Sequence, residues 1–239
     1  MKNINWTGVF PAVTTKFTDS DELDLALFEV NIRAQMNAGA AGIILGGTLG
    51  EASTLSATEK DNLVKECLRI VNGSIPVIIN IAEQTTKSAV EAAKRAEEIG
   101  ANGLMLLPPM RYKADDRETL HYLKAVAEST DLPIMIYNNP VDYGIEVTME
   151  MFAELAAFSN VQAVKESTRD LSNVTRMRSR FGDRYKILCG VDTLALESLL
   201  MELTDNVEIV GTAKTVTDGV QLLENEEIDL LFLDIKLRG

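Results

Sequence analysis

Histidine, cysteine and positive charge are all scarce in this chain of 239 residues. Its single histidine, His121, excludes a histidine-based catalytic triad and any metal site built on several histidines. We expect His121 to be a solvated residue on an amphipathic helix. The two cysteines, Cys67 and Cys189, lack the spacing of a metal-binding motif, so we expect two reduced and buried thiols. The sequence therefore predicts no metal site and no cofactor.

Acidic residues outnumber basic ones, 36 against 23, and the formal net charge is −13. This balance disfavours binding to nucleic acid or to anionic lipid, and it leaves a small molecule as the expected partner. No run approaches the roughly 20 apolar residues of a membrane span. The first residues, MKNINWTGVF, lack the positive region and apolar run of a secretory signal. We therefore expect a cytoplasmic protein without a membrane segment.

Short β-rich runs alternate with helical patterns along the whole chain, which predicts parallel strands joined by helices. Ser56 with Glu59 forms a capping-box pattern, and Thr148 suits an N-cap. Gly100 ends the helix that runs through Val90 and Ala96. Eight such units close a (β/α)8 barrel of the TIM type, in which functional groups lie at the C-terminal ends of the strands. A single α/β domain is thus predicted. Nine runs suit strands, and they start at Gly8, Gly42, Pro76, Gly103, Pro133, Val161, Tyr185, Val207 and Ile228.

The sixth run carries a lysine near its end. Val161, Ala163 and Lys165 alternate onto one face, so Lys165 points into the barrel if its small and apolar neighbours do. A lysine held there loses hydration, which favours the neutral amine that attacks a carbonyl group. The alternative is a solvent-facing lysine at a strand end.

The ends of the fifth and second runs offer partners for this lysine. Met135 and Tyr137 share a face, and a phenol at a strand end can transfer protons during imine formation and carbon–carbon cleavage. A buried structural tyrosine is the alternative. In the loop GTLGE at 47–51, the glycines let backbone amides approach a ligand and Thr48 adds a hydroxyl group, an arrangement that suits a carboxylate. Many strand-to-helix turns are equally rich in glycine.

Together, these motifs resemble the dihydrodipicolinate synthase and N-acetylneuraminate lyase family over residues 1 to about 203. The resemblance implies a class I lyase, in which Lys165 forms a Schiff base with a 2-oxo acid such as pyruvate. It also implies that Tyr137 relays protons and that Thr48, with the amides around Gly47 and Leu49, holds the carboxylate. The matching segments are GTLGE at 47–51, YNNP at 137–140, VQAVKEST at 161–168 and CGVD at 189–192.

Three departures from the family pattern bear on the substrate. Leu49 stands where the family usually has a second threonine, and Met110-Arg111 stands where an aromatic pair is expected after the fourth strand. Asp142 stands where dihydrodipicolinate synthases have an arginine that binds the second substrate. The departures favour a lyase, aldolase or dehydratase that acts on a 2-oxo or sugar-derived acid. We expect Arg111 to bind an anionic end of that substrate and Asp142 to lie at the substrate site. The family often forms dimers or tetramers, so a homo-oligomer is the expected assembly.

Residues 204–239 resemble a strand, helix and strand of a response-regulator receiver domain, which is flavodoxin-like. We expect 207–211 to supply the eighth strand and 216–224 its helix, while 230–234 either pairs with the barrel as a ninth strand of the same domain or packs against another subunit. Asp234 occupies the phosphoacceptor position but lacks the partner carboxylates that bind Mg²⁺, so we expect it to be structural. The junction indicates a natural or deliberate, de novo recombination. Such a chimera is either an enzyme whose activity is impaired by the exchanged C-terminal segment or a catalytically inactive scaffold.

Overall fold

The computed structural model describes residues 3–109 and 112–191. Arg111 and the segment 204–239, with its predicted eighth strand, eighth helix and ninth strand, lie outside the described residues. None of the helices within the described part combines the length and the apolarity needed to cross a membrane.

Six strands form one parallel sheet, and each strand pairs with the next one along the chain. This arrangement confirms the predicted parallel β/α order for the second to the seventh runs. The first run forms only an isolated bridge between Ala12 and Ile44, where Pro11 has no N–H group with which to extend the pairing. The strands are β1 (Ile43–Leu45), β2 (Val77–Ile81), β3 (Gly103–Leu106), β4 (Ile134–Asn138), β5 (Val161–Glu166) and β6 (Lys186–Cys189).

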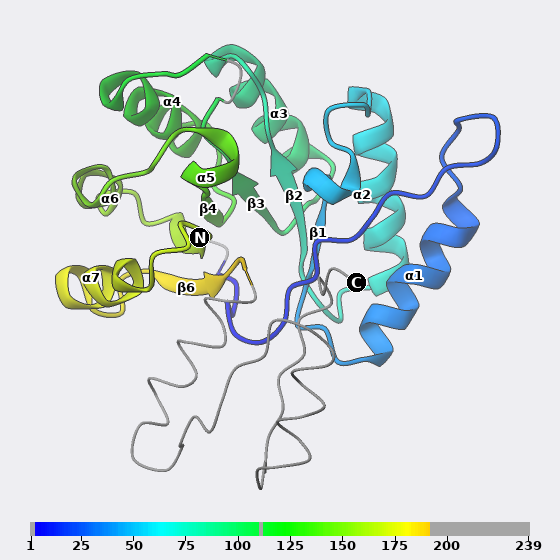
Figure 1. The fold of residues 1–239 in the computed structure, drawn as a ribbon. Helices are drawn as coiled ribbons and strands as arrows, with labels where there is room; N and C mark the ends of the chain where they lie inside the picture. Colours follow the sequence, from blue (N-terminus) through cyan, green and yellow to red (C-terminus); the bar gives the residue numbers. More distant parts are fainter. Residues whose placement is uncertain (1–2, 110–111, 192–239) are drawn as a thin grey trace, which may run out of the picture.

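The helices lie around the outside of this curved sheet, as Figure 1 shows. Three predicted helix ends are confirmed: Ser56 and Glu59 form a capping box, the Thr148 side chain caps its helix, and Gly100, with φ +92°, follows the last turn of another. The α-helices are α1 (Leu25–Asn37), α2 (Ala57–Val71), α3 (Thr86–Glu98), α4 (Asp116–Glu128), α5 (Pro140–Tyr143), α6 (Met149–Leu155) and α7 (Leu171–Phe181), and η1 (Thr48–Gly50) is a 3₁₀ turn.

Alternate residues of the strands belong to two separate apolar clusters. The larger cluster packs the outer face of the sheet against the helices and includes Ile79 and Val164. The smaller cluster lies on the inner face, where Trp6 of the N-terminal segment packs with Met135, Tyr137 and Ala163. The inner face therefore carries the side chains that would face the interior of a barrel.

The alternation is interrupted once, in β5. The register between β4 and β5 shifts between Ile134 and Met135. Val161 consequently packs in the outer cluster whereas Ala163 packs in the inner one, so the prediction that the two share a face is wrong. The extra residue, Gln162, accepts a hydrogen bond of 3.0 Å from Trp6 Nε1. The bulge thus ties the N-terminal segment to β5.

The two cysteines differ in their environment. Cys67 lies buried in α2, as expected, and burial raises the pKa of its thiol to about 12. Cys189 lies in β6 but is exposed, so the prediction that both thiols are buried is wrong for this residue. His121 is exposed on α4, as expected.

Candidate active site

Lys165 and Tyr137 stand opposite each other at the C-terminal ends of β5 and β4. The Lys165 Nζ atom lies 4.3 Å from the centre of the Tyr137 ring. The Tyr137 side chain is only 8% exposed, and Lys165 is half-buried. The sequence predicted that these two residues would share the inner face, and the structure brings them together there.

A cavity of about 540 Å³ lies beside Lys165, along β6 and the N-terminal segment, and neither Tyr137 nor Thr48 is among the residues that line it. Lys165 and Met135 line one wall, and residues 6–10 of the N-terminal segment line another. A volume of this size is typical of a pocket for a small molecule. The amine of Lys165 is therefore placed where it can meet a small ligand.

Gly190 allows β6 to end directly beside this lysine. A Cβ atom at residue 190 would lie 2.0 Å from Ser167 Oγ and 2.9 Å from Lys165 Cγ. The Gly190 N–H group also donates to the carbonyl oxygen of Glu166, at 2.8 Å. Only glycine leaves Lys165 its observed position.

The loop after β1 is held firmly against its surroundings. Thr15 Oγ1 donates to the Gly50 carbonyl oxygen at 2.6 Å, and Asn80 Nδ2 donates to the Gly46 carbonyl oxygen at 2.8 Å. Gly47 is buried, whereas Thr48 and Leu49 are exposed. The Leu49 side chain, 74% exposed, points to solvent, so this residue can offer only its backbone to a ligand bound inside.

Thr48 connects to the tyrosine pair through a residue that the sequence analysis did not identify. The Thr48 hydroxyl is hydrogen-bonded to the Tyr143 hydroxyl on α5. The Tyr143 ring meets the Tyr137 ring edge-on, with centroids 5.6 Å apart and planes at 81°. Burial raises the pKa of Tyr143 above its ordinary value, the hydrogen bond with Thr48 opposes this shift, and the neighbouring Tyr137 adds to it. The only sequence signal for this contact is a second tyrosine shortly after YNNP.

Asn139 connects Tyr137 to the predicted substrate-binding residue Asp142. Its Nδ2 atom donates both to Tyr137 Oη, at 3.1 Å, and to Asp142 Oδ2, at 2.8 Å. The other oxygen of Asp142 accepts from Arg169 Nη2 at 3.3 Å. Asp142 therefore lies close to the tyrosine pair, but its carboxylate is already paired with a cation.

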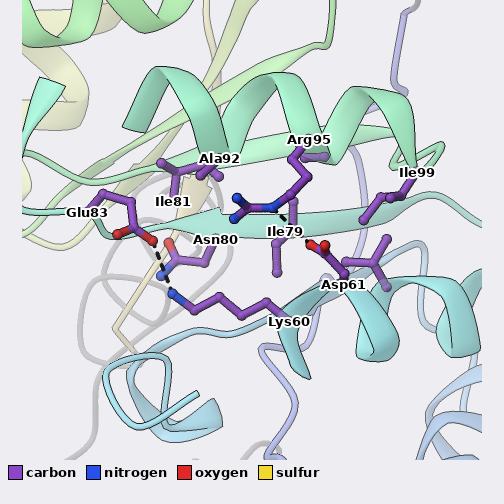
Figure 2. A pocket seen from close by; sticks show the side chains of 11 residues that line it. Lys60, Asp61, Ile79, Asn80, Ile81, Glu83, Ala92, Arg95 and Ile99 are labelled. Atoms are coloured by element: carbon purple, nitrogen blue, oxygen red, sulfur yellow. Dashed lines mark hydrogen bonds and ion pairs between the residues drawn. The ribbon is translucent and has the colours of Figure 1, made fainter. Parts of the chain in front are cut away.

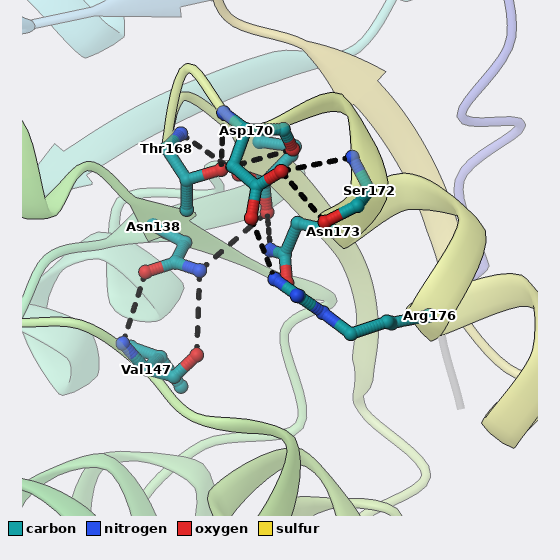
Figure 3. A network of polar contacts seen from close by, with 8 residues as sticks. Asn138, Val147, Thr168, Asp170, Ser172, Asn173 and Arg176 are labelled. Atoms are coloured by element: carbon teal, nitrogen blue, oxygen red, sulfur yellow. Dashed lines mark hydrogen bonds and ion pairs between the residues drawn. The ribbon is translucent and has the colours of Figure 1, made fainter.

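The outer face of the same strand ends carries a second polar network, which Figure 3 shows. Glu166 is 1% exposed and accepts from the Thr168 N–H at 2.8 Å and from Asn173 Nδ2 at 2.7 Å. Asn138 exchanges two hydrogen bonds with the backbone of Val147. Burial raises the pKa of the Glu166 carboxyl group, although its hydrogen bonds act in the opposite direction. This network holds the C-terminal ends of β4 and β5 in place on the outer face of the sheet.

A second pocket, between α2 and α3, is not a candidate site. Its charged side chains are paired, Lys60 with Glu83 at 3.1 Å and Arg95 with Asp61 at 3.3 Å, as Figure 2 shows. The cavity measures only about 20 Å³, which is room for one water molecule.

Comparison with known sequences places these features in context. The sequence model of the Dihydrodipicolinate synthetase family matches residues 5–216. A 4-hydroxy-tetrahydrodipicolinate synthase from Exiguobacterium sibiricum is 35% identical over 185 residues, which are 77% of this chain and 63% of that protein. An enzyme of the same name from Thermotoga sp. strain RQ2 is 36% identical over 173 residues, 72% of this chain and 58% of that protein. The chain thus spans somewhat less than two thirds of the length of these two relatives.

Solved structures give the same result. The dihydrodipicolinate synthase from Aquifex aeolicus superposes with a TM-score of 0.78 and 29% identity, over 82% of this chain and 67% of that one. A prophage protein of the same family from E. coli K12, solved in complex with pyruvate, superposes with a TM-score of 0.77 and 27% identity, over 82% of this chain and 67% of that one.

Proposed function

The chain belongs to the dihydrodipicolinate synthetase family, and we propose that it is a Schiff-base-forming lyase, aldolase or dehydratase that acts on a 2-oxo acid such as pyruvate. The observation that carries this proposal is the placement of Lys165. Its amine lies 4.3 Å from the centre of the Tyr137 ring and on the wall of a cavity of about 540 Å³.

In the proposed reaction the neutral Lys165 amine attacks the C2 carbonyl carbon of the 2-oxo acid. A nitrogen–carbon bond forms, and a proton passes from the nitrogen to the former carbonyl oxygen, which becomes a hydroxyl group. Tyr137 donates a proton to that hydroxyl as it leaves, so water departs and an iminium ion remains. The iminium withdraws electrons from C3, which permits loss of a proton or cleavage of a carbon bond there.

The substrate carboxylate is proposed to bind at the loop after β1. The hydroxyl of Thr48 and the backbone amides around Gly47 and Leu49 are the donors that this loop offers. The Leu49 side chain points to solvent and adds no hydroxyl group. The carboxylate site therefore has one hydroxyl donor fewer than the family's usual pair of threonines provides.

We further propose that the second substrate or product differs from that of the synthases named above. Asp142 stands where those enzymes would use an arginine, and Arg169 neutralises it at 3.3 Å. The Asp142–Arg169 pair leaves no net cation to grip a second carboxylate. We propose that Arg111 binds an anionic end of the substrate instead.

The C-terminal segment is proposed to complete the same domain. The family match runs to residue 216 and so includes the predicted eighth strand at 207–211. We propose that 204–239 supplies this strand and its helix, that 230–234 packs as an additional strand, and that Asp234 is structural. The receiver-like pattern supports a recombined origin, and the family resemblance supports a cytoplasmic homo-oligomer.

Sodium borohydride trapping in the presence of pyruvate tests the function. A stable adduct on Lys165, located by mass spectrometry of peptides, is the expected result. Lys186 lines the same cavity and serves as the matched control. Lys186→Arg should leave the adduct unchanged, and Lys165→Arg should abolish it. Folded wild-type protein that forms no adduct would identify an inactive scaffold.

A further inference from the structure

Asn139 is buried between Tyr137 and the first turn of α5, and its side chain is only 2% exposed. Its Nδ2 atom donates to Tyr137 Oη at 3.1 Å and to Asp142 Oδ2 at 2.8 Å. Its Oδ1 atom accepts from the backbone N–H of Asp142 at 3.2 Å. Both polar atoms of this amide are therefore engaged, and one partner is the phenol whose ring lies 4.3 Å from the Lys165 amine.

These contacts allow the Asn139 amide only one orientation. The Asp142 backbone N–H can only donate, and the Asp142 carboxylate, which also accepts from Arg169 Nη2 at 3.3 Å, can only accept. If the amide were turned over, Oδ1 would face the carboxylate and Nδ2 would face the N–H group, so both bonds would be lost. In the observed orientation Nδ2 donates to Tyr137 Oη, and the Tyr137 proton must point away from Asn139.

Helix capping alone does not account for an asparagine at this position. Asn139 is the N-cap residue of α5, and the cap uses only the oxygen that accepts from the Asp142 N–H group. Serine, threonine or aspartate would supply such an oxygen equally well. The bond to Tyr137 Oη needs an amide nitrogen, and asparagine alone among these capping residues has one.

We propose that Asn139 is a positioning residue for Tyr137, and that Asp142 acts on the reaction through Asn139 rather than by binding the substrate. This inference rests on the proposed function. One carboxylate oxygen of Asp142 is paired with Arg169 and the other accepts from Asn139, so the carboxylate holds the amide in place. The amide in turn holds the oxygen atom of the phenol.

Asn139 serves the step in which the carbinolamine loses its hydroxyl group. Tyr137 gives its proton to that hydroxyl, the carbon–oxygen bond breaks, and its electron pair leaves with the water molecule. An iminium ion and a phenolate remain, and the phenolate becomes neutral again when it takes a proton from C3. The bond from Nδ2 strengthens as negative charge develops on Oη, because a hydrogen bond to an ionised oxygen is about twice as strong as one between neutral groups.

The test measures exchange of the C3 protons of pyruvate in D₂O by NMR, with the stability of each variant to urea measured in parallel. Asn139→Leu keeps a similar side-chain volume and removes the donor. It should lower the maximal exchange rate by about 10- to 100-fold and leave half-saturating pyruvate nearly unchanged, because the bond matters most when Oη is charged. Val141 is exposed on the same helix, and Val141→Ala is the control that should match wild type.

Asp142 supplies the second arm of the test. Asp142→Ala removes the acceptor that holds the amide and should slow maximal exchange by about 2- to 10-fold, whereas Asp142→Asn offers an acceptor again and should recover most of the rate. In a protein that already carries Asn139→Leu, Asp142→Ala should have no further effect. Should Asn139→Leu fail to fold, the Ala and Asn variants of Asp142 carry the test.

The outcomes separate the two proposals. An equal maximal rate in Asn139→Leu and wild type, losses that multiply in the double variant, or an Asp142→Asn protein as slow as Asp142→Ala would overturn the positioning role and leave the Schiff-base function standing. Wild-type protein that neither forms a borohydride adduct nor exchanges C3 protons would overturn both.

Discussion

The inner and outer faces of β4 and β5 differ completely at neighbouring residues. Tyr137 pairs with Lys165 on the inside, and one step along the strands Asn138 pairs with Glu166 on the outside. The outer pair is enclosed in hydrogen bonds to backbone and side chains that leave it one arrangement. Lys165 of the inner pair lines a cavity, and among the residues that the structure describes its amine and the Tyr137 hydroxyl are not enclosed in such a network. The outer face therefore holds the strand ends, and the inner face is free for chemistry.

The largest difference should follow removal of the inner amine. Lys165→Ala should lower turnover by about 10⁴-fold or more, as loss of a nucleophile does in other enzymes, while the stability to urea stays close to wild type. Lys186→Ala, on the same cavity wall, should change neither quantity much. A Lys165→Ala protein that unfolds far more easily would show that the inner face is structural as well.

Gly190→Ala should affect both faces together. The added methyl group meets Ser167 Oγ at 2.0 Å and Lys165 Cγ at 2.9 Å, so we expect a loss of about 1–3 kcal/mol in the free energy of unfolding and a slower trapping rate. Ser167→Ala, added to Gly190→Ala, removes the closest contact and should recover part of both losses. Failure of this second change to recover anything would contradict the steric explanation.

Glu166→Gln should cost stability and little chemistry. The amide that replaces one carboxylate oxygen cannot accept the hydrogen bonds of that oxygen, so we expect a loss of about 1–3 kcal/mol in urea unfolding at neutral pH. The exposed residue Glu146 provides the matched control, and Glu146→Gln should unfold like wild type. A large fall in kcat at unchanged stability would contradict the division between the two faces.

The pH dependence of stability also tests the structural role of Glu166. The pKa of Glu166 in the folded protein lies above its ordinary 4.5, so the folded state favours the protonated form. Its contribution to stability is complete below pH about 4.5 and is lost as the pH rises through the folded-state pKa. Urea titrations between pH 4 and 8 should show this fall in wild type and a flatter profile in Glu166→Gln.

The smallest effect concerns the two thiols. Cys189 is exposed at the end of β6, whereas Cys67 is buried with a pKa raised to about 12. Ellman's reagent should modify one thiol in the native protein and both in denaturant. Modification of two thiols without denaturant would show that the helical layer opens readily at α2.

Local patterns predicted much of this structure because they depend on neighbouring residues alone. The alternation of strands and helices, the capping box at Ser56 and the inward direction of Tyr137 and Lys165 all follow from period and position. These rules need no knowledge of which segments meet in space.

The features that sequence reasoning missed depend on contacts between distant segments. The bulge at Gln162 arises from pairing with β4 and from the bond to Trp6, and no period in the sixth run indicates it. Tyr143 approaches Thr48 from 95 residues away, so this contact has no local signal beyond a tyrosine after YNNP. The exposure of Cys189 likewise depends on what packs outside β6 rather than on its own strand pattern.

The bond between Trp6 and Gln162 also constrains the order of folding. The two residues are 156 positions apart, and the N-terminal segment that lines the cavity is anchored through this contact. Closing so long a loop is slow, and the bond cannot form until β5 has been synthesised and paired. During synthesis, the N-terminal segment must therefore wait until β5 has emerged from the ribosome, and the cavity beside Lys165 is closed late.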